Sequence, residues 1–277
     1  MTRFARGWEL MKRCFAVLKS DKQLMLLPIA SAACCLLVSA VIVLGGVPLF
    51  LAMRHAGATP SRALIWLGIF VFYLANYMVI VFFNVALVAA ASEALAGRTA
   101  TLGDGLSKAW ERRTHVFEWA LLSATVGTIL QIIESRLGAI GKLTARLLGV
   151  AWGLATFFVA PVLVFEEIGP IDALKRSSKI FRDTWGDDLR AQFSMGAVFG
   201  LLMLAGIGVA CLMIFKGGTV GLYAAIPLGI LFVLALIVTN ATLQGIFSVA
   251  VYQYAATKTV PPGFVMENFS MAWKPKK

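Results

Sequence analysis

Charged residues are scarce in this sequence. Asp, Glu, Lys and Arg make up 14% of its 277 residues, whereas 60% are hydrophobic. Ordinary soluble domains carry about 25% charged and about 45–50% apolar residues. A soluble fold could not bury so much apolar surface, so the composition predicts a protein that resides in lipid.

The basic residues form no compact stripe. The 25 Lys and Arg residues outnumber the 14 Asp and Glu residues, and they lie between apolar runs. This placement is typical of membrane proteins that contact anionic headgroups. No nucleic-acid recognition motif accompanies the charge. The expected partners are therefore membrane lipids, mainly anionic ones, and not nucleic acid.

Residue types that build catalytic and metal sites are also few. The two histidines are His55 and His115, which the predicted topology places at opposite sides of a membrane. No Walker sequence, HExxH motif or dinucleotide-binding glycine motif is present. The four cysteines form no CxxC pair: they are Cys14, Cys34, Cys35 and Cys211. We expect no metal, no cofactor and no enzymatic activity, since an enzyme acting on lipid would have to work through carboxylates alone.

Long apolar runs dominate what remains. A helix needs about 20 apolar residues to cross the hydrocarbon of a bilayer. Six stretches qualify, at about 24–53, 63–96, 115–133, 147–165, 193–215 and 222–257. They predict an all-α fold: a polytopic membrane helical bundle of about six transmembrane helices, forming a single integral membrane domain over residues 1–277.

The distribution of Lys and Arg predicts the orientation of these spans. Segments 1–23, 97–114, 166–192 and 258–277 hold 19 of them, and the alternate loops hold six. The positive-inside rule places the richer loops in the cytoplasm. Both termini are therefore predicted to be cytoplasmic, in a protein integral to the cytoplasmic (inner) membrane.

Amphipathic helices are predicted before spans one, three and five. In the first, one helical face carries Phe4, Trp8, Met11, Phe15 and Leu18. The second starts with Thr101 and Asp104, which resemble a capping box. The third starts at Pro170, and one of its faces carries Ile171, Leu174, Ser178, Phe181 and Trp185. Helices of this kind lie at headgroup level, with six candidate headgroup contacts: Arg6, Arg13, Lys175, Arg176, Lys179 and Arg182. The alternative is that they are cytoplasmic linkers folded on one another.

Three acids lie at the predicted cytoplasmic edge, namely Glu118, Glu166 and Glu167. A carboxylate near low dielectric can hold a proton or a cation at the mouth of a path. The alternative is an interface cap, in which each acid pairs with a nearby arginine.

Polar residues inside the spans leave two interpretations open. They are Tyr73, Asn76, Tyr77 and Asn84 in span two, and Asn240 and Gln244 in span six. Such groups turn inward in hydrocarbon, where they line a path for a polar substrate or bond across helices and hold the bundle. The GxxxG pairs Gly149/Gly153 and Gly196/Gly200 predict close packing of spans four and five.

One segment of the chain has a familiar pattern. From Pro161 to Ser177, the end of an apolar span is followed by Glu166 at the membrane edge and then by Asp172-Ala-Leu-Lys-Arg176-Ser177. This pattern resembles the family of unknown function DUF6159. It is more distantly similar to the membrane domain found beside some glycerophosphodiester phosphodiesterases. The resemblance implies six spans in a bacterial cytoplasmic membrane, and it implies no activity.

These observations favour a non-enzymatic membrane component that interacts with lipids or proteins. The alternative is a small transporter or channel with a polar path between spans two and six. A homo-oligomer, or a complex with other membrane proteins, is compatible with either function.

Overall fold

The computed structural model describes residues 3–57, 61–99, 101–136, 138–185 and 190–257, without the side chains of residues 3–10, 138–140, 184–185 and 190–198. Every regular element in this part of the chain is a helix, so the predicted all-α fold is confirmed. The chain divides into two compact units. Unit 1 comprises Met1–Met25, Ala91–Ala100 and Arg182–Lys277, and unit 2 comprises Leu26–Ala90 and Thr101–Phe181. The assignment of the whole chain to one membrane domain stays a prediction.

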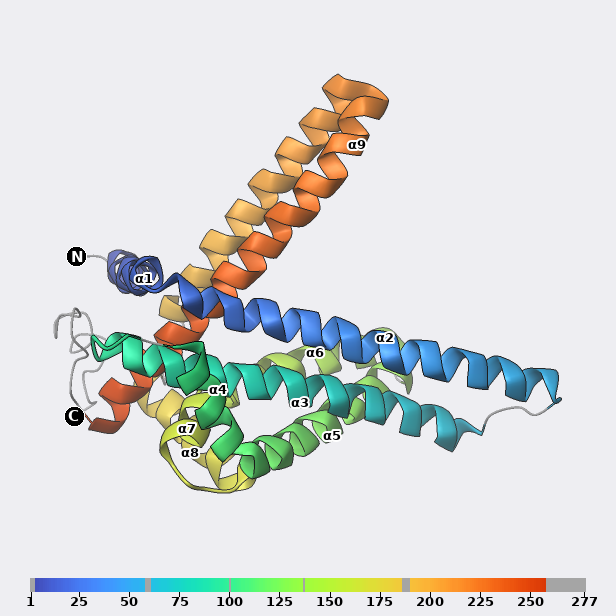
Figure 1. The fold of residues 1–277 in the computed structure, drawn as a ribbon, viewed down its shortest axis with the longest axis horizontal. Coiled ribbons are helices and arrows are strands. Elements are labelled where there is room, and N and C mark those ends of the chain that lie inside the picture. The colour runs from blue at the N-terminus through green and yellow to red at the C-terminus, as the bar shows by residue number, and fades with distance from the viewer. Residues whose placement is uncertain (1–2, 58–60, 100, 137, 186–189, 258–277) are drawn as a thin grey trace. The chain divides into compact units, whose positions relative to one another are not determined.

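Within the described residues, five helical segments are long and apolar enough to cross a membrane: Lys22–His55, Arg62–Leu95, Arg113–Arg136, Gly141–Phe165 and Phe199–Ala256. The last belongs to α9 (Arg190–Thr257), which is bent at Gly218, where φ is +54°. Glycine adopts this left-handed conformation at little cost. Figure 1 shows that α9 turns back on itself there, so its two arms correspond to the predicted spans 193–215 and 222–257.

The two arms of α9 pack closely against each other. A Cβ added at Gly206 would clash with the ring of Phe232, and one added at Gly221 would clash with the backbone of Met213. Small residues therefore allow the hairpin to close at two levels.

The first helix of unit 1 is docked on α9. α1 (Arg3–Ser20) continues through the short helix η1 (Lys22–Met25), and both contact α9. Cys14 and Leu18 are buried, whereas Phe15 is 52% exposed. The helix predicted before span one is thus present, and part of its predicted apolar face is covered by protein.

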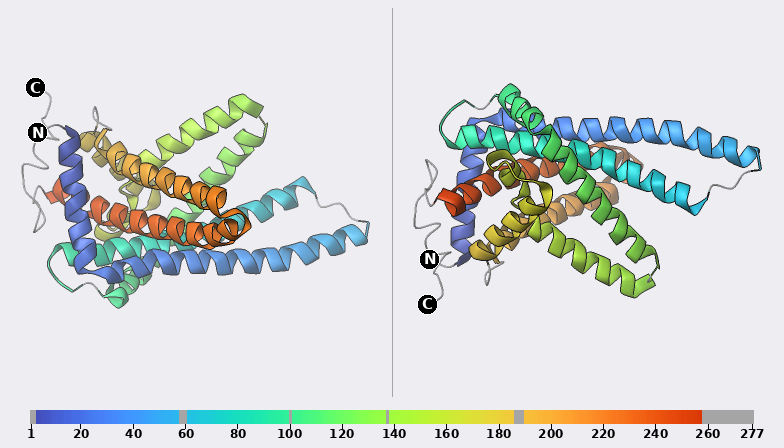
Figure 2. Two further views of the ribbon diagram at one scale, coloured as in Figure 1. Left: turned by 90° about the horizontal axis from the view of Figure 1, so that it is seen from above. Right: turned by 90° about the horizontal axis from the view of Figure 1, so that it is seen from below.

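Unit 2 is built from two helical hairpins and three shorter helices. α2 (Leu26–His55) and α3 (Arg62–Leu95) run side by side, and Ser39 of α2 donates to Asn76 Oδ1 of α3 at 3.2 Å (Figures 1 and 2). α5 (Arg113–Arg136) and α6 (Gly138–Ala155) form the second hairpin. Trp119 of α5 stacks on Trp152 of α6, with ring centroids 5.8 Å apart. The shorter helices are α4 (Leu102–Glu111), α7 (Val159–Phe165) and α8 (Pro170–Trp185), of which α8 belongs to unit 2 up to Phe181.

The start of α4 follows the predicted cap. Thr101 Oγ1 accepts a hydrogen bond from the backbone N–H of Asp104 at 3.1 Å. The Asp104 carboxylate bonds the Thr101 hydroxyl, whereas a capping-box glutamate would reach the backbone N–H of the cap residue. Further along α4, Gly105 lies against α3, so that an added Cβ would be 2.6 Å from the carbonyl oxygen of Ala86.

Candidate functional site

A break in the fourth apolar segment organises one end of unit 2. α6 ends at Ala155 and α7 begins at Val159, with a turn at residues 156–158 between them. The buried hydroxyl of Ser177, on α8, accepts from the backbone N–H of Phe158 at 3.0 Å and donates to the carbonyl of Ala155 at 2.6 Å. A side chain thus occupies the gap in the helical hydrogen-bond ladder, which is a recognised cause of helix kinks.

The local sequence explains why the helix breaks there. Pro161 has no N–H to donate to the carbonyl of Phe157, and its ring disfavours continuous helix across this position. In the first turn of the separate helix α7, the same proline is tolerated. Four residues separate the end of α7 from the start of α8, and Pro170 is the first residue of α8, as predicted.

Two ion pairs hold the α7–α8 connection. Arg176 Nε donates to Glu166 Oε1 at 2.9 Å, which ties α8 back to the residue following α7. Arg112, at the end of α4, lies 2.7 Å from Glu167 Oε1. The Arg112 side chain is only 13% exposed, whereas that of Glu167 is 77% exposed, so the pair is screened mainly on the glutamate side. The α4–α5 junction and the α7–α8 connection therefore lie together at one end of unit 2.

The third predicted acid has a different partner from the one expected. Glu118 lies 3.3 Å from His115 Nδ1, one turn earlier on α5. On α4, the Lys108 ammonium donates to Glu111 at 2.8 Å and lowers the pKa of that exposed carboxyl. Glu166 and Glu167 each pair with an arginine, as in the interface-cap alternative, whereas Glu118 lies beside a histidine. A proton or cation role for them stays a prediction.

Three kinds of side chain follow one another around α8, because successive residues of a helix turn by about 100°. One stripe is buried: Ala173, Ser177 and Ile180. The next is largely apolar and less covered: Ile171, Leu174, Ser178 and Phe181. The third is basic and exposed: Lys175, Lys179 and Arg182.

The apolar stripe is the predicted face of α8, except that the side chain of Trp185 lies outside the described residues. Ile171 is 60% exposed, so unit 2 leaves the beginning of this stripe uncovered. The buried stripe was missed because alanine and serine contribute little hydrophobicity to a periodic pattern. Its signal was the Ser177 that ends the Asp-Ala-Leu-Lys-Arg-Ser run.

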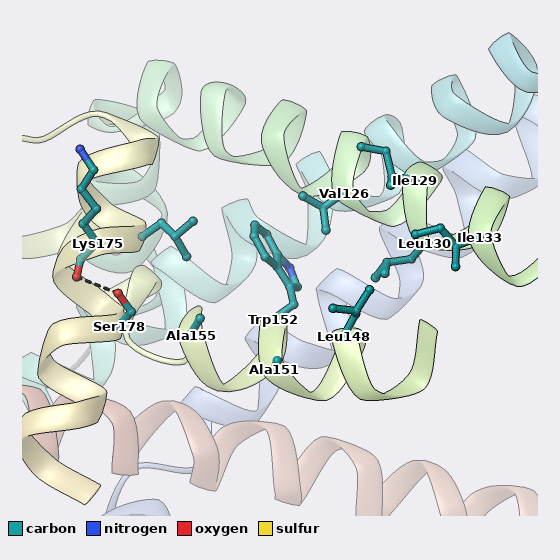
Figure 3. Close-up of a pocket in the computed structure, with 11 residues that line it drawn as sticks. Val126, Ile129, Leu130, Ile133, Leu148, Ala151, Trp152, Ala155, Lys175 and Ser178 are labelled. Atoms are coloured by element: carbon teal, nitrogen blue, oxygen red, sulfur yellow. Dashed lines mark hydrogen bonds between the residues drawn. The ribbon is translucent and has the colours of Figure 1, made fainter. Parts of the chain in front are cut away.

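An apolar groove of about 610 Å³ runs between α5 and α6 (Figure 3). Its sides are Val126, Ile129, Leu130 and Ile133 of α5, and Leu148, Ala151, Trp152 and Ala155 of α6. Leu174, Lys175 and Ser178 of α8 line one end. Figure 3 shows Trp152 between the two rows, with Lys175 at the α8 end. No sequence pattern indicates this groove, because it depends on how two helices diverge.

The structure gives less detail about the two predicted headgroup contacts on α1. Arg13 of α1 is half-buried, and the side chain of Arg6 lies outside the described residues.

On α4, which carries no predicted contact, Trp110 is 64% exposed and the Arg113 guanidinium lies over its ring at 5.6 Å. Each of the three helices therefore presents an exposed apolar side chain beside basic ones.

The polar residues predicted to line a path are divided between the two units. In unit 2, Tyr73 donates to Gln131 Oε1 at 3.3 Å, and the Asn76 amide donates to the carbonyl of Phe72 at 2.9 Å. The Tyr77 ring packs beside Gly127 of α5, and Asn84 is exposed. The Tyr73 and Tyr77 contacts link α3 to α5, and the Ser39 bond to Asn76 links it to α2, as expected of groups that hold a bundle.

The span-six members of the predicted path lie in unit 1. Asn240 Oδ1 is buried and has no hydrogen-bond partner among the described residues, whereas Gln244 is exposed. A path between spans two and six stays a prediction.

The predicted GxxxG contact would join span four, in unit 2, to span five, in unit 1, and it stays a prediction. A Cβ added at Gly149, Gly153 or Gly200 would meet no described atom within 4 Å, and the side-chain environment of Gly196 is not described. The glycines that do allow close approach are Gly105, Gly206 and Gly221. Spacing alone does not show which side of a helix faces a neighbour.

No group of three His, Cys, Asp or Glu side chains that could hold a metal occurs among the described residues. No curated protein and no solved structure matches the chain. The similarity to the membrane domain beside glycerophosphodiester phosphodiesterases and a bacterial source stay predictions. The model of the family of unknown function DUF6159 matches residues 63–261, which is more than half of the 277 residues, and the chain therefore belongs to this family.

Proposed function

We propose that this chain is a non-enzymatic membrane protein that binds anionic lipid through its basic surface helices, α8 above all. The observation that carries the proposal is the order of stripes around α8. A protein-facing stripe adjoins an apolar one, which in turn adjoins an exposed basic one. A helix lying at the boundary of a bilayer needs this order, because its apolar side enters the acyl region while Lys and Arg reach the headgroups.

The acids that follow α7 support this location for α8. The fourth apolar segment carries no charged residue between Arg146 and Glu166, and these 19 residues are close to the about 20 that cross a bilayer. Its end at Phe165 then lies at the edge of the bilayer, where Glu166 and Glu167 reach water. Arg176 pairs with Glu166 and so holds α8 at this same level.

The proposal favours lipid over a transported solute as the ligand. Asn76 accepts a bond from α2 and donates one within α3, and the hydroxyl of Tyr73 donates to α5, which leaves these groups less able to bind a passing substrate. We also propose that α8 lies on the cytoplasmic side of the inner membrane. This orientation is inferred from the distribution of Lys and Arg between the loops.

Hydrogen exchange in nanodiscs tests the proposal. The parent protein should exchange more slowly over residues 171–182 in nanodiscs that contain phosphatidylglycerol than in pure phosphatidylcholine. The double variant Lys179→Glu/Arg182→Glu should lose this difference, since each basic residue near an anionic surface contributes about 1 kcal/mol. Arg176 is left unchanged because it pairs with Glu166.

A matched control carries the same change in charge elsewhere. Lys142 and Arg146 are exposed on α6, towards the end of that helix away from α8. Lys142→Glu/Arg146→Glu should keep the lipid-dependent protection of α8. If the parent exchanges equally in both kinds of nanodisc, α8 does not recognise anionic lipid and the proposal is wrong.

A further inference from the structure

We propose that the groove between α5 and α6 is a binding site for one anionic phospholipid, with an acyl chain along Trp152 and the phosphate at Lys175. This inference rests on the proposed function, because it takes α8 to lie at the headgroup level. It goes further in assigning a discrete site, and not merely a charged surface, to the lipid.

The walls of the groove fit a hydrocarbon chain. Eight of its lining residues come from α5 and α6, and all of them are apolar. The volume of about 610 Å³ lies within the range of roughly 300–1,000 Å³ typical of small-molecule sites. Apolar cavities do not retain water, whereas a bilayer supplies acyl chains to any groove that opens into it. Trp152 offers a flat face to such a chain and is itself supported by its stack on Trp119.

The α8 end of the groove fits an anionic group. The Lys175 side chain is 73% exposed, and its ammonium bonds Asp172 at 3.0 Å. An ammonium has three N–H donors, so Lys175 can keep this bond and still donate to a phosphate oxygen. Ser178 donates its own hydrogen to the carbonyl of Lys175 at 2.9 Å, which leaves its oxygen able only to accept. Lys175 is therefore the phosphate-binding residue at this end.

The charge around this end favours an anionic lipid over a zwitterionic one. Lys179, one turn further along α8, is exposed on the same basic stripe as Lys175. Of the acids nearby, Asp172 pairs with Lys175, and Glu166 pairs with Arg176 on another side of α8. A phosphatidylcholine headgroup brings a cation to this basic surface, whereas phosphatidylglycerol brings only the phosphate charge.

Native mass spectrometry of the full chain with added dioleoyl phosphatidylglycerol tests the site. The parent should retain one phosphatidylglycerol more strongly than phosphatidylcholine. Ala151→Phe fills the groove from α6 at an exposed position, and it should lower the retained lipid at least about tenfold, equivalent to 1.4 kcal/mol. Val150→Phe is the matched control, since the neighbouring Val150 is 57% exposed and does not line the groove.

Two further variants keep the test decisive. Ile129→Trp fills the groove from α5, where Ile129 is half exposed, and it should act like Ala151→Phe if the latter folds poorly. Lys175→Glu should remove the preference for phosphatidylglycerol over phosphatidylcholine while lipid of either kind is still retained. Equal retention by the parent, Ala151→Phe, Ile129→Trp and Val150→Phe would overturn the groove site.

The outcome is separable from that of the proposed function. In phosphatidylglycerol nanodiscs, Ala151→Phe should keep the hydrogen-exchange protection of α8, because it leaves the basic stripe intact. If Ala151→Phe keeps the protection of α8 and also retains as much lipid as the parent, only the groove site is overturned. If the parent itself shows no lipid-dependent protection of α8, the proposed function is overturned.

Discussion

The Ser177 hydroxyl accepts a hydrogen bond from the backbone N–H of Phe158 at 3.0 Å, across 19 residues of sequence. The same hydroxyl donates to the carbonyl of Ala155. One side chain thus satisfies two of the backbone groups exposed by the break between α6 and α7, and it fixes α8 beside that break.

This double hydrogen bond gives the first prediction. Ser177→Ala should destabilise the protein by about 1–3 kcal/mol, because it leaves a buried N–H and a buried carbonyl unsatisfied. Ser178→Ala is the control, since Ser178 bonds only the carbonyl of Lys175 within its own helix and should cost little. Thermal unfolding in detergent compares the two, and equal melting temperatures for both variants would argue against the clamp.

The contact of α4 with α3 gives the second prediction. A Cβ at Gly105 would be 2.6 Å from the Ala86 oxygen and 3.2 Å from the Ala90 Cβ. Gly105→Ala should therefore cost about 1–3 kcal/mol through overpacking. Gly103→Ala, on the same helix with its nearest neighbour at 3.8 Å, should be tolerated. The contact is refuted if the two variants melt at the same temperature.

Burial of Cys14 gives a prediction about pH. Burial raises the pKa of its thiol to about 12 from an ordinary value of 9.0. In the unfolded chain the thiol ionises first, so the stabilising contribution of Cys14 is present below pH 9 and decreases as the pH rises towards 12. The decrease is at most about 1.4 kcal/mol per pH unit.

This effect is measured by comparing the melting temperatures of the parent and of Cys14→Ala from pH 7.5 to 10.5. Their difference should be constant up to about pH 9, the ordinary thiol pKa, and should narrow above it. A constant difference over the whole range would mean that α1 does not bury Cys14 against α9.

The predicted topology is tested by labelling single cysteines in a cysteine-free parent. Exposed positions suit this test: Ala56 and Gly217 for the outer side, and Ser107 and Lys179 for the cytoplasmic side. A membrane-impermeant maleimide applied to whole cells should label the first pair only, because the Lys- and Arg-rich loops are retained in the cytoplasm. Labelling at Lys179→Cys from outside would reverse the orientation.

The sequence predicted the helices better than it predicted their contacts. Apolar run length indicated the membrane-length segments, and turn chemistry correctly placed the N-cap of α4 at Thr101 and the start of α8 at Pro170. These are local properties of the chain. The break at residues 156–158 was missed, because it depends on Ser177, a residue distant in sequence.

Glycine shows the same difference between spacing and contact. Gly149 and Gly153 have the spacing of a packing motif but meet no neighbour within 4 Å in their own unit, whereas the isolated Gly105 lies tightly against Ala86. On α8, the acid pairing with Arg176 was foreseen because Glu166 is close in sequence, but the groove beside Lys175 was not. Contacts between helices depend on rotation and divergence, which composition and periodicity do not specify.

The central claim is that α8 lies at the boundary of the bilayer with its apolar stripe in lipid. A spin label at Ile171→Cys, compared with one at Lys179→Cys in nanodiscs, measures this most directly through relaxation by oxygen, which concentrates in lipid, and by a water-soluble nickel chelate. Both positions are exposed in the structure, so protein cover does not distinguish them. The account predicts that Ile171 responds mainly to oxygen and Lys179 mainly to nickel. Equal and strong relaxation of both labels by nickel would show that α8 lies in water, and it would contradict the account.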